Sequence, residues 1–267
     1  MRTLVDFLDL DRVGPDHFIS SKESPLSRPT LFGGALIAQA LRAAAATTAS
    51  EVYPNSLHAT FLRAGQSGAD VHHHVERTRD GRSFASRQVR VAQGERTIMT
   101  MTASFHRDEV GGEFQRRWPP TPAPPDVRPL APHEDALGVE VVDLTDATAT
   151  AADLEYLAWA RSAHPLADDR VLQCCVLAYI SDTGAPAVAA AAIGVHAGGP
   201  NREAGSVMTT SLDHAMWFHR PGRADDWLLI RGIPVSTARS RGLVLGSMFD
   251  RSGAHLASFT QELLIRH

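Results

Sequence analysis

Cysteine is scarce in this chain, and no part of it carries a long run of one charge. The 267 residues include two cysteines, Cys174 and Cys175, which are adjacent. Adjacent cysteines rarely close a relaxed disulfide, so we expect free thiols and a reducing, cytoplasmic location. The net charge of −4 and the lack of a lysine or arginine block give no expectation of a nucleic-acid partner.

Long apolar runs are also missing. No run reaches the roughly 20 residues that a helix needs to cross a bilayer, so we expect no membrane insertion. The N-terminal segment carries Asp6, Asp9 and Asp11, where a secretory signal would have basic residues and an apolar run. The last residues, Leu264-Ile265-Arg266-His267, do not form a peroxisomal signal. Both observations agree with a cytoplasmic location.

Proline is concentrated in one segment, which divides the chain. Between Trp118 and Pro132 prolines are too frequent for a helix or a central strand. We therefore expect an N-terminal unit at residues 1–106, a proline-rich connector at residues 107–150 and a C-terminal unit at residues 151–267.

The two flanking units repeat one order of elements. Each has a helix rich in small residues, predicted from Phe32 to about Thr47 and from Val171 to about Asp182. Strand-like runs follow each helix: Leu57–Ala64, Asp70–Thr78, Ser83–Gln93 and Arg96–His106, then Val207–His219, Trp227–Ser236, Gly242–Phe249 and His255–Arg266. A leading strand at Leu154–Arg161 is also possible. The pattern predicts an α+β fold in which a helix covers one face of an antiparallel sheet, twice.

A short echo supports this duplication. Phe61-Leu62-Arg63-Ala64-Gly65 recurs as Phe218-His219-Arg220-Pro221-Gly222. The spacing of the echo is too long for a solenoid repeat, so it indicates a duplicated domain.

The strand predicted at residues 207–219 has polar residues on both faces. A period of two places Ser211 and Asp213 on one face and His214 on the other. Buried polar groups need partners, so this strand is expected to line a site. The structural alternatives are an ordinary strand hydroxyl for Ser211 and a carboxylate paired with Arg220, His219 or a backbone amide for Asp213.

Asp182 lies at the end of the apolar stripe of the second helix. Burial there would raise the pKa of its carboxyl group, which suits a general base. Capping of the next turn, at residues 185–192, is an equally good explanation. Gln261 shares an apolar strand face with Ala257, Phe259 and Leu263, so its amide needs a partner such as substrate, water or backbone.

Other features give weaker signals. His72, His73 and His74 alternate across a strand and cannot meet at one metal ion. The backbone N–H groups of Gly33 and Gly34, at a helix start, could bind an oxyanion, although close packing explains two glycines equally well. Five arginines near strand ends could meet phosphate groups, and none is assigned: Arg63, Arg87, Arg220, Arg239 and Arg241.

Several motifs together resemble the acyl-CoA thioesterase II family. In the first half these are Phe32-Gly33-Gly34-x-x-x-x-Gln39-Ala40, His58-x-x-Phe61-Leu62-Arg63-x-Gly65, Thr78-Arg79-Asp80-Gly81-Arg82-Ser83-Phe84 and Met101-Thr102-Ala103-Ser104-Phe105. In the second half they are the run from Ser211 to Pro221, which holds Asp-His-x-Met-Trp-Phe-His-Arg-Pro, and Gln261-Glu262. The connector has few matches, and Leu263 stands where family members usually carry glycine.

The resemblance implies a double hotdog fold, in which two antiparallel sheets join and each wraps round a long central helix. It implies hydrolysis of fatty acyl-CoA to free acid and CoA, with acyl-CoA as partner and no metal or cofactor. The catalytic trio carries over as Asp182 in Tyr-x-Ser-Asp, Ser211 two residues before Asp-His, and Gln261. His58 is placed near the site by family position only, and Gly33 or Gly34 is the oxyanion candidate.

Two other functions stay open at this point. A hotdog enoyl-CoA hydratase would pair Asp182 with a histidine about five residues later, and residues 183–187 contain none. A non-catalytic module would bind acyl-CoA or an acyl carrier, which the intact trio argues against. Because hotdog sheets leave an edge that often pairs with another copy, a homodimer or homotetramer is expected.

Overall fold

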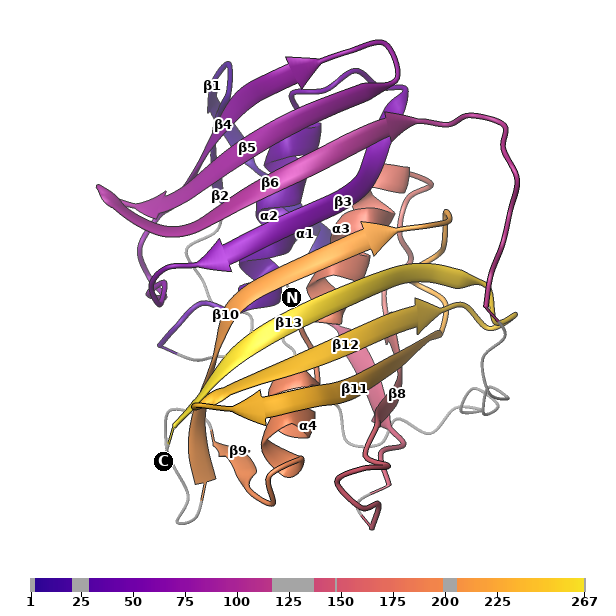
Figure 1. The fold of residues 1–267 in the computed structure, drawn as a ribbon. Coiled ribbons are helices and arrows are strands. Elements are labelled where there is room, and N and C mark those ends of the chain that lie inside the picture. Colours follow the sequence, from indigo (N-terminus) through magenta and orange to yellow (C-terminus); the bar gives the residue numbers. More distant parts are fainter. Residues whose placement is uncertain (1–2, 21–28, 117–136, 147, 199–205, 267) are drawn as a thin grey trace.

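One continuous sheet, antiparallel except for one short parallel strand, runs through both halves of the chain, with two central helices behind it (Figure 1). The computed structural model describes residues 3–20, 29–116, 137–146, 148–198 and 206–266. The double hotdog expectation is confirmed: the sheet is a single layer that curves round helices α2 and α3, which pack against each other.

The first half contributes two helices and six strands. The helices are α1 (Leu4–Leu8) and α2 (Gly33–Ala45). The strands are β1 (Asp11–Gly14), β2 (His17–Ser20), β3 (Val52–Phe61), β4 (Val71–Asp80), β5 (Phe84–Gln93) and β6 (Arg96–Arg107). Strands β3 to β6 and helix α2 match the elements predicted from the sequence, whereas α1, β1 and β2 were not predicted.

The second half repeats the plan with additions. Its helices are α3 (Arg170–Ser181) and α4 (Ala185–Ala191). Its strands are β7 (Val139–Asp143), β8 (Tyr156–Ser162), β9 (His196–Gly198), β10 (Ser206–Phe218), β11 (Leu228–Ala238), β12 (Arg241–Phe249) and β13 (His255–Arg266). Strand β7 pairs with β8 and lies inside the segment predicted as connector. The sheet of the second half therefore begins before residue 151, because apolar residues at 139, 141 and 142 continue its core.

The strand order joins the halves at β3 and β10. The order is β1-β2-β4-β5-β6-β3-β10-β13-β12-β11-β8-β7, with β9 beside β10. Strands β3 and β10 pair antiparallel, with His214 opposite Ala59 and Ala215 opposite His58. In Figure 1 they lie side by side where the violet half meets the orange half. Residues alternate along both strands, so one face packs on the helices and the other faces outward.

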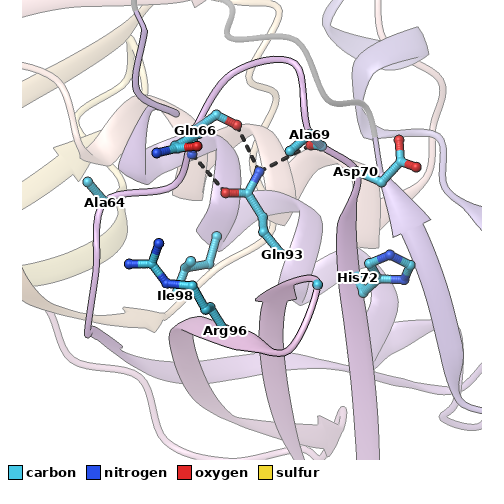
Figure 2. Close-up of a pocket in the computed structure, with 9 residues that line it drawn as sticks. Ala64, Gln66, Ala69, Asp70, His72, Gln93, Arg96 and Ile98 are labelled. Carbon is cyan, nitrogen blue, oxygen red and sulfur yellow. Dashed lines mark hydrogen bonds between the residues drawn. The ribbon is translucent and has the colours of Figure 1, made fainter.

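The start of α2 is fixed by a loop from the first sheet. The side-chain amide of Gln93 accepts a hydrogen bond from the Gln66 N–H and donates to the carbonyls of Gln66 and Ala69, as Figure 2 shows. The same loop pairs with the segment before the helix, where the Leu31 N–H donates to the Gly65 carbonyl. Because Leu31 lies two residues before α2, these bonds fix where the helix begins.

Helix α3 begins at a conventional cap and ends at a tight turn. The Asp169 carboxylate accepts hydrogen bonds from the N–H groups of Val171 and Leu172. The helix ends at Ser181, and Gly184 follows with a positive φ of 82°. A side chain at Gly184 would collide with the Tyr156 ring, so glycine is required there. The stretch Arg170–Ala191 is apolar enough to cross a membrane by composition, and most of it is buried inside this fold.

Candidate active site

Asp182, Ser211 and Gln261 meet behind the sheet in the second half. Asp182 caps the C-terminus of α3, Ser211 lies on β10 and Gln261 lies on β13. The Gln261 Nε2 atom donates to Oδ1 of Asp182 at 2.5 Å and to Oγ of Ser211 at 2.8 Å. Both hydrogens of this fully buried amide are therefore committed, and the three predicted residues form one connected cluster.

The Asp182 carboxyl group is buried and electrostatically perturbed. Burial raises its pKa from 3.8 to about 6, and hydrogen bonds from Gln261 and Gly34 oppose part of that rise. The capping explanation for Asp182 is wrong. The residue preceding α4 is Gly184, and no side chain caps that helix. A carboxylate with a pKa near neutrality can accept a proton during catalysis.

The N-terminus of α2 holds the second oxygen of this carboxylate. The Gly34 N–H donates to Oδ2 of Asp182 at 2.7 Å. A Cβ at Gly34 would lie 2.5 Å from the Tyr179 carbonyl oxygen, and one at Gly33 would lie 2.7 Å from Oδ2 of Asp182. Gly34 therefore serves the carboxylate rather than an oxyanion, which changes the role expected for it. Within the ranges that the structure describes, no hydrogen bond to the Gly33 N–H is found.

A β-bulge in β10 decides which side chains enter the cluster. Ser211 is opposite Leu263, whereas Asp213 is opposite Glu262, so Leu212 is an extra residue. Ser211 and Asp213 consequently lie on opposite faces, and the prediction that they share a face is wrong. Asp213 is exposed, and its carboxylate accepts the Glu262 N–H from the outer side.

His214 belongs to the cluster, although regular strand alternation predicted it on the face opposite Ser211. Its ring is fully buried, with Nδ1 3.3 Å from Oε1 of Gln261 and Nε2 2.9 Å from Oγ of Ser181. Burial lowers its pKa from 6.5 to about 4, so the imidazole is neutral at pH 7. The sequence feature that could have identified His214 was its position directly after Asp213 in the Asp-His motif. Without the bulge, His214 and Ser211 would have pointed to opposite faces.

His58 lies away from the cluster, and its expected place near the site is wrong. Its side chain is exposed on the outer face of the sheet, where it meets the Trp217 ring edge to face at 5.3 Å. The neighbours Leu57 and Ala59 are the residues of β3 that point inward. The alternation of side chains along β3 therefore separates His58 from Asp182 by the thickness of the sheet.

The histidine run and the two cysteines lie outside the Asp182 cluster. His73 is fully buried, while His72 and His74 point outward beside His17, which confirms their alternation. Cys174 and Cys175 are free and buried, and burial raises the pKa of the Cys174 thiol to about 12.

The hollow in Figure 2 is lined by Ala64, Gln66, Ala69, Asp70, His72, Gln93, Gly94, Arg96 and Ile98. It shares no residue with the Asp182 cluster.

Arg87 is buried and cannot bind a phosphate at the surface. Its guanidinium donates to Oγ1 and the carbonyl of Thr47, to the carbonyls of Arg79 and Ser86, and to Asp80. Thr47 follows the end of α2, so Arg87 ties this helix end to the sheet. This contact corrects its place among the phosphate candidates.

In the described part of the first half, the positions equivalent to the cluster hold no polar side chains like those of Ser211, His214 and Gln261. The repeated segments Phe61–Gly65 and Phe218–Gly222 are 157 residues apart, so Pro54 is the residue equivalent to Ser211. Strand β3 has the same bulge, between Pro54 and Ser56. Leu57 and Ala103 pair as His214 and Gln261 do. None of these three side chains can hydrogen-bond, and Arg87 stands opposite Ala103.

Two family models match the chain. Residues 22–106 match the acyl-CoA thioesterase N-terminal domain, and residues 146–264 match acyl-CoA thioesterase. The chain is 32% identical to mouse acyl-coenzyme A thioesterase 8, over 88% of this chain and 80% of that protein. It is 30% identical to acyl-CoA thioesterase 2 of Haemophilus influenzae, over 100% of this chain and 98% of that protein.

Solved structures give the same result. The tesB protein of Mycobacterium avium subspecies paratuberculosis is 29% identical with a TM-score of 0.82, over 98% of both chains. The acyl-CoA thioesterase II TesB2 of Mycobacterium marinum is 32% identical with a TM-score of 0.81, over 98% of this chain and 97% of that one.

Proposed function

This chain belongs to the acyl-CoA thioesterase II family and hydrolyses acyl-CoA thioesters, and we propose that Asp182, Ser211 and Gln261 activate the attacking water. One observation carries this assignment. A single amide, that of Gln261, contacts both the Asp182 carboxylate and the Ser211 hydroxyl. The three groups come from a helix end and two strands and converge within hydrogen-bond distance.

In the proposed reaction Asp182 is the general base. It takes a proton from water as the water oxygen attacks the thioester carbonyl carbon, and the tetrahedral intermediate then expels the CoA thiolate as the C–S bond breaks. The proton held by Asp182 passes to the thiolate or to solvent. Gln261 donates both amide hydrogens to Asp182 and Ser211 and so orients the water through these two groups. General-base catalysis of this kind contributes roughly 10²–10⁴-fold. No side chain attacks carbon, so no acyl-enzyme forms.

The developing oxyanion needs a hydrogen-bond donor. The Gly33 N–H is our candidate, because it lies at the first position of α2 beside Asp182, while the Gly34 N–H is already bonded to the carboxylate. A helix N-terminus also presents the positive end of the helix dipole, which favours negative charge at this place.

Thiol release from acyl-CoA substrates of different chain lengths tests the assignment. Asp182→Asn should reduce kcat at least a hundredfold with the fold intact. Asp213→Asn is the matched control, since this carboxylate lies on the outer face of the neighbouring strand and should leave kcat unchanged. An Asp182→Asn variant with near-normal turnover would remove the base role.

The same assay separates the alternative functions. A hydratase would add water to an enoyl-CoA without releasing thiol, and a binding module would bind acyl-CoA without turnover. Trapping of a covalent acyl-protein by mass spectrometry would contradict direct attack by water.

The proposal also covers the substrate, the cellular location and the oligomeric state. We propose fatty acyl-CoA as substrate, a cytoplasmic location and a homodimer or homotetramer. Two free, buried cysteines support a reducing compartment. Exposed apolar residues on the outer face of β11 and β12, namely Ile233, Val235 and Leu245, support self-association. Light scattering of the purified protein tests the oligomer, since a monomer at micromolar concentration would contradict it.

A further inference from the structure

Behind the proposed catalytic groups, a buried polar chain joins the end of α3 to β13. Ser181, the residue before Asp182, contacts Nε2 of His214 at 2.9 Å, and Nδ1 of His214 contacts Oε1 of Gln261 at 3.3 Å. All three side chains are fully buried. The His214 ring also stacks on Phe259, which stands two residues before Gln261 on β13. The proposed mechanism uses Gln261 but leaves His214 and Ser181 without a role.

The direction of each hydrogen bond in this chain follows from the chemistry of its members. The two hydrogens of the Gln261 amide nitrogen go to Asp182 and Ser211, so Oε1 faces His214 and can only accept. Nδ1 of His214 must therefore carry a hydrogen. A neutral imidazole has one N–H, so Nε2 is bare and needs a donor. The Ser181 hydroxyl lies 2.9 Å from both Nε2 and the Ala178 carbonyl, and its single hydrogen must turn to Nε2 when His214 is the Nδ1–H tautomer.

We infer that His214, as the neutral Nδ1–H tautomer, is a positioning residue that locks the Gln261 amide with its nitrogen toward Asp182 and Ser211. This role rests on the proposed function. If the amide rotated by 180°, its NH₂ group would face the Nδ1–H of His214, two donors in contact, and its oxygen would face Asp182. Both contacts are unfavourable in a buried site. The Ser181 hydroxyl supports this tautomer by donating a hydrogen bond to Nε2 in place of the Ala178 carbonyl.

Locking the amide also affects proton affinity at Asp182. An amide nitrogen facing Asp182 stabilises the carboxylate, whereas a rotated amide oxygen would accept a proton from the neutral carboxylic acid. Removing the Nδ1–H donor makes the rotated form accessible when Asp182 is protonated. The pKa of Asp182 should then rise, whereas a purely structural role for His214 would leave it unchanged.

Among the residues that the structure describes, few titratable groups lie near Asp182. The elements packed around Asp182 present Tyr179 from α3, which lies against Phe32, and His214 from β10. Asp213 of β10 accepts a backbone N–H on the outer face, and Glu262 of β13 pairs with Arg241. Burial and two hydrogen bonds account for the pKa of Asp182, so a change at Gln261 should be visible in the pH profile.

The test compares His214→Phe with His214→Asn. Phenylalanine keeps a ring to stack on Phe259 and removes both nitrogens. Asparagine loses the ring but carries an N–H at the same number of bonds from Cβ as Nδ1. We expect His214→Phe to lower kcat roughly tenfold to a hundredfold, with KM within about threefold, because the amide that positions Asp182 and Ser211 is no longer fixed. The acid limb of kcat/KM should move up by roughly half to one pH unit, the equivalent of one neutral hydrogen bond.

His214→Asn should restore much of kcat and return the acid limb to its wild-type position, although it leaves a cavity. The matched control is His73→Phe. His73 is also fully buried and bonded to a serine, Ser20, but it lies on β4 in the other half. This variant should lose thermal stability as His214→Phe does, while its pH profile per folded molecule stays that of the wild type.

The wild-type protein provides a check that does not depend on variant folding. Long-range ¹H–¹⁵N NMR on histidine-labelled protein, with the His214→Asn spectrum for assignment, should show His214 as the Nδ1–H tautomer from pH 5 to 8. An Nε2–H tautomer or an imidazolium would overturn the inference. So would a His214→Phe profile equal to that of His73→Phe while Asp182→Asn is inactive. An active Asp182→Asn would instead overturn the proposed function.

Discussion

The Gly34 N–H and the Asp182 carboxylate are hydrogen-bonded at 2.7 Å, although 148 positions separate the two residues in the sequence. Gly34 lies in the first turn of α2, and Asp182 caps α3. The opposite oxygen of the carboxylate is held by Gln261 from β13. The proposed general base is therefore oriented by donors from both halves of the chain, which fixes both of its oxygens before substrate binds.

The first prediction concerns the pH dependence of turnover. Because protonated Asp182 cannot accept a proton from water, kcat/KM should fall tenfold per pH unit below about pH 6, the pKa to which burial raises this group. Initial rates of thiol release between pH 4.5 and 8 measure the limb. A profile that stays flat down to pH 4.5 would show that a group with an ordinary carboxyl pKa, or none, limits the reaction.

The second prediction concerns stability. The folded-state pKa of Asp182 lies above the ordinary aspartate pKa of 3.8, so the native state binds the proton more tightly than the unfolded chain. Stability therefore falls as pH rises from about 4 to about 6, and the full cost, on the order of 3 kcal/mol, persists above that. Asp182→Asn should consequently gain stability relative to wild type on going from pH 5 to pH 7.5. Urea unfolding at both pH values measures this difference, and an unchanged difference would contradict the raised pKa.

The third prediction concerns the close approach of α2 to α3. Gly34→Ala places a Cβ 2.5 Å from the Tyr179 carbonyl oxygen, so the helices must shift. We expect a loss of about 1–3 kcal/mol in unfolding free energy and a clear drop in kcat, because the helix shift moves the N–H of residue 34 away from the Asp182 carboxylate. Gly111→Ala is the control, because a Cβ there meets no atom within 4 Å. Equal behaviour of the two variants in thermal melts and rates would refute the prediction.

The fourth prediction separates the two faces of the sheet. His58→Ala should keep kcat and KM within about twofold of wild type, because this ring stands on the outer face against Trp217. Steady-state kinetics on the purified variant tests this. A tenfold loss of kcat would mean that the outer face contributes to the reaction.

The fifth prediction concerns Arg87. Arg87→Met removes a buried guanidinium that bonds Thr47, Arg79, Ser86 and Asp80. It should cost about 1–3 kcal/mol of unfolding free energy, because the buried acceptors at Thr47 lose their donor while Asp80 is exposed to solvent. Arg90→Met, on the exposed side of the same strand, should cost less than about 0.5 kcal/mol. Arg87→Met protein that is folded should keep its kcat, because the lost hydrogen bonds lie in the first half, away from the Asp182 cluster. Denaturant unfolding and specific activity at low temperature provide the comparison.

Periodicity and the echo were sufficient to predict the two helix-and-sheet units. Their central helices and seven of the eight main strands lie within about two residues of the predicted bounds, because each has a regular apolar pattern. The exception is β3, predicted at Leu57–Ala64 and found at Val52–Phe61. The proline-rich composition concealed β7, whose five residues pair with β8 just after the densest prolines. Short strands such as β1 and β2 have too few residues for a pattern to show.

The three predicted catalytic residues do lie together, but the sequence did not show which strand face each neighbouring side chain occupies. Asp182 and Gln261 were found from polar positions on apolar faces. Ser211 was found too, but with Asp213 as a wrong companion, because a bulge of one residue reverses the alternation and leaves no mark in composition. His58 was misplaced because family position does not tell which way a strand side chain points.

The bulge shared by β3 and β10, with proline at one copy and serine at the other, has a consequence for how the halves respond to substitution. At residues 54, 57 and 103, a change should be judged by volume and shape alone, since these side chains only fill space. At the equivalent residues 211, 214 and 261, the side chains form hydrogen bonds. An isosteric replacement that fits well there can therefore still be inactive. Two matching scaffolds within one polypeptide thus provide an internal comparison between packing and chemistry at equivalent sites.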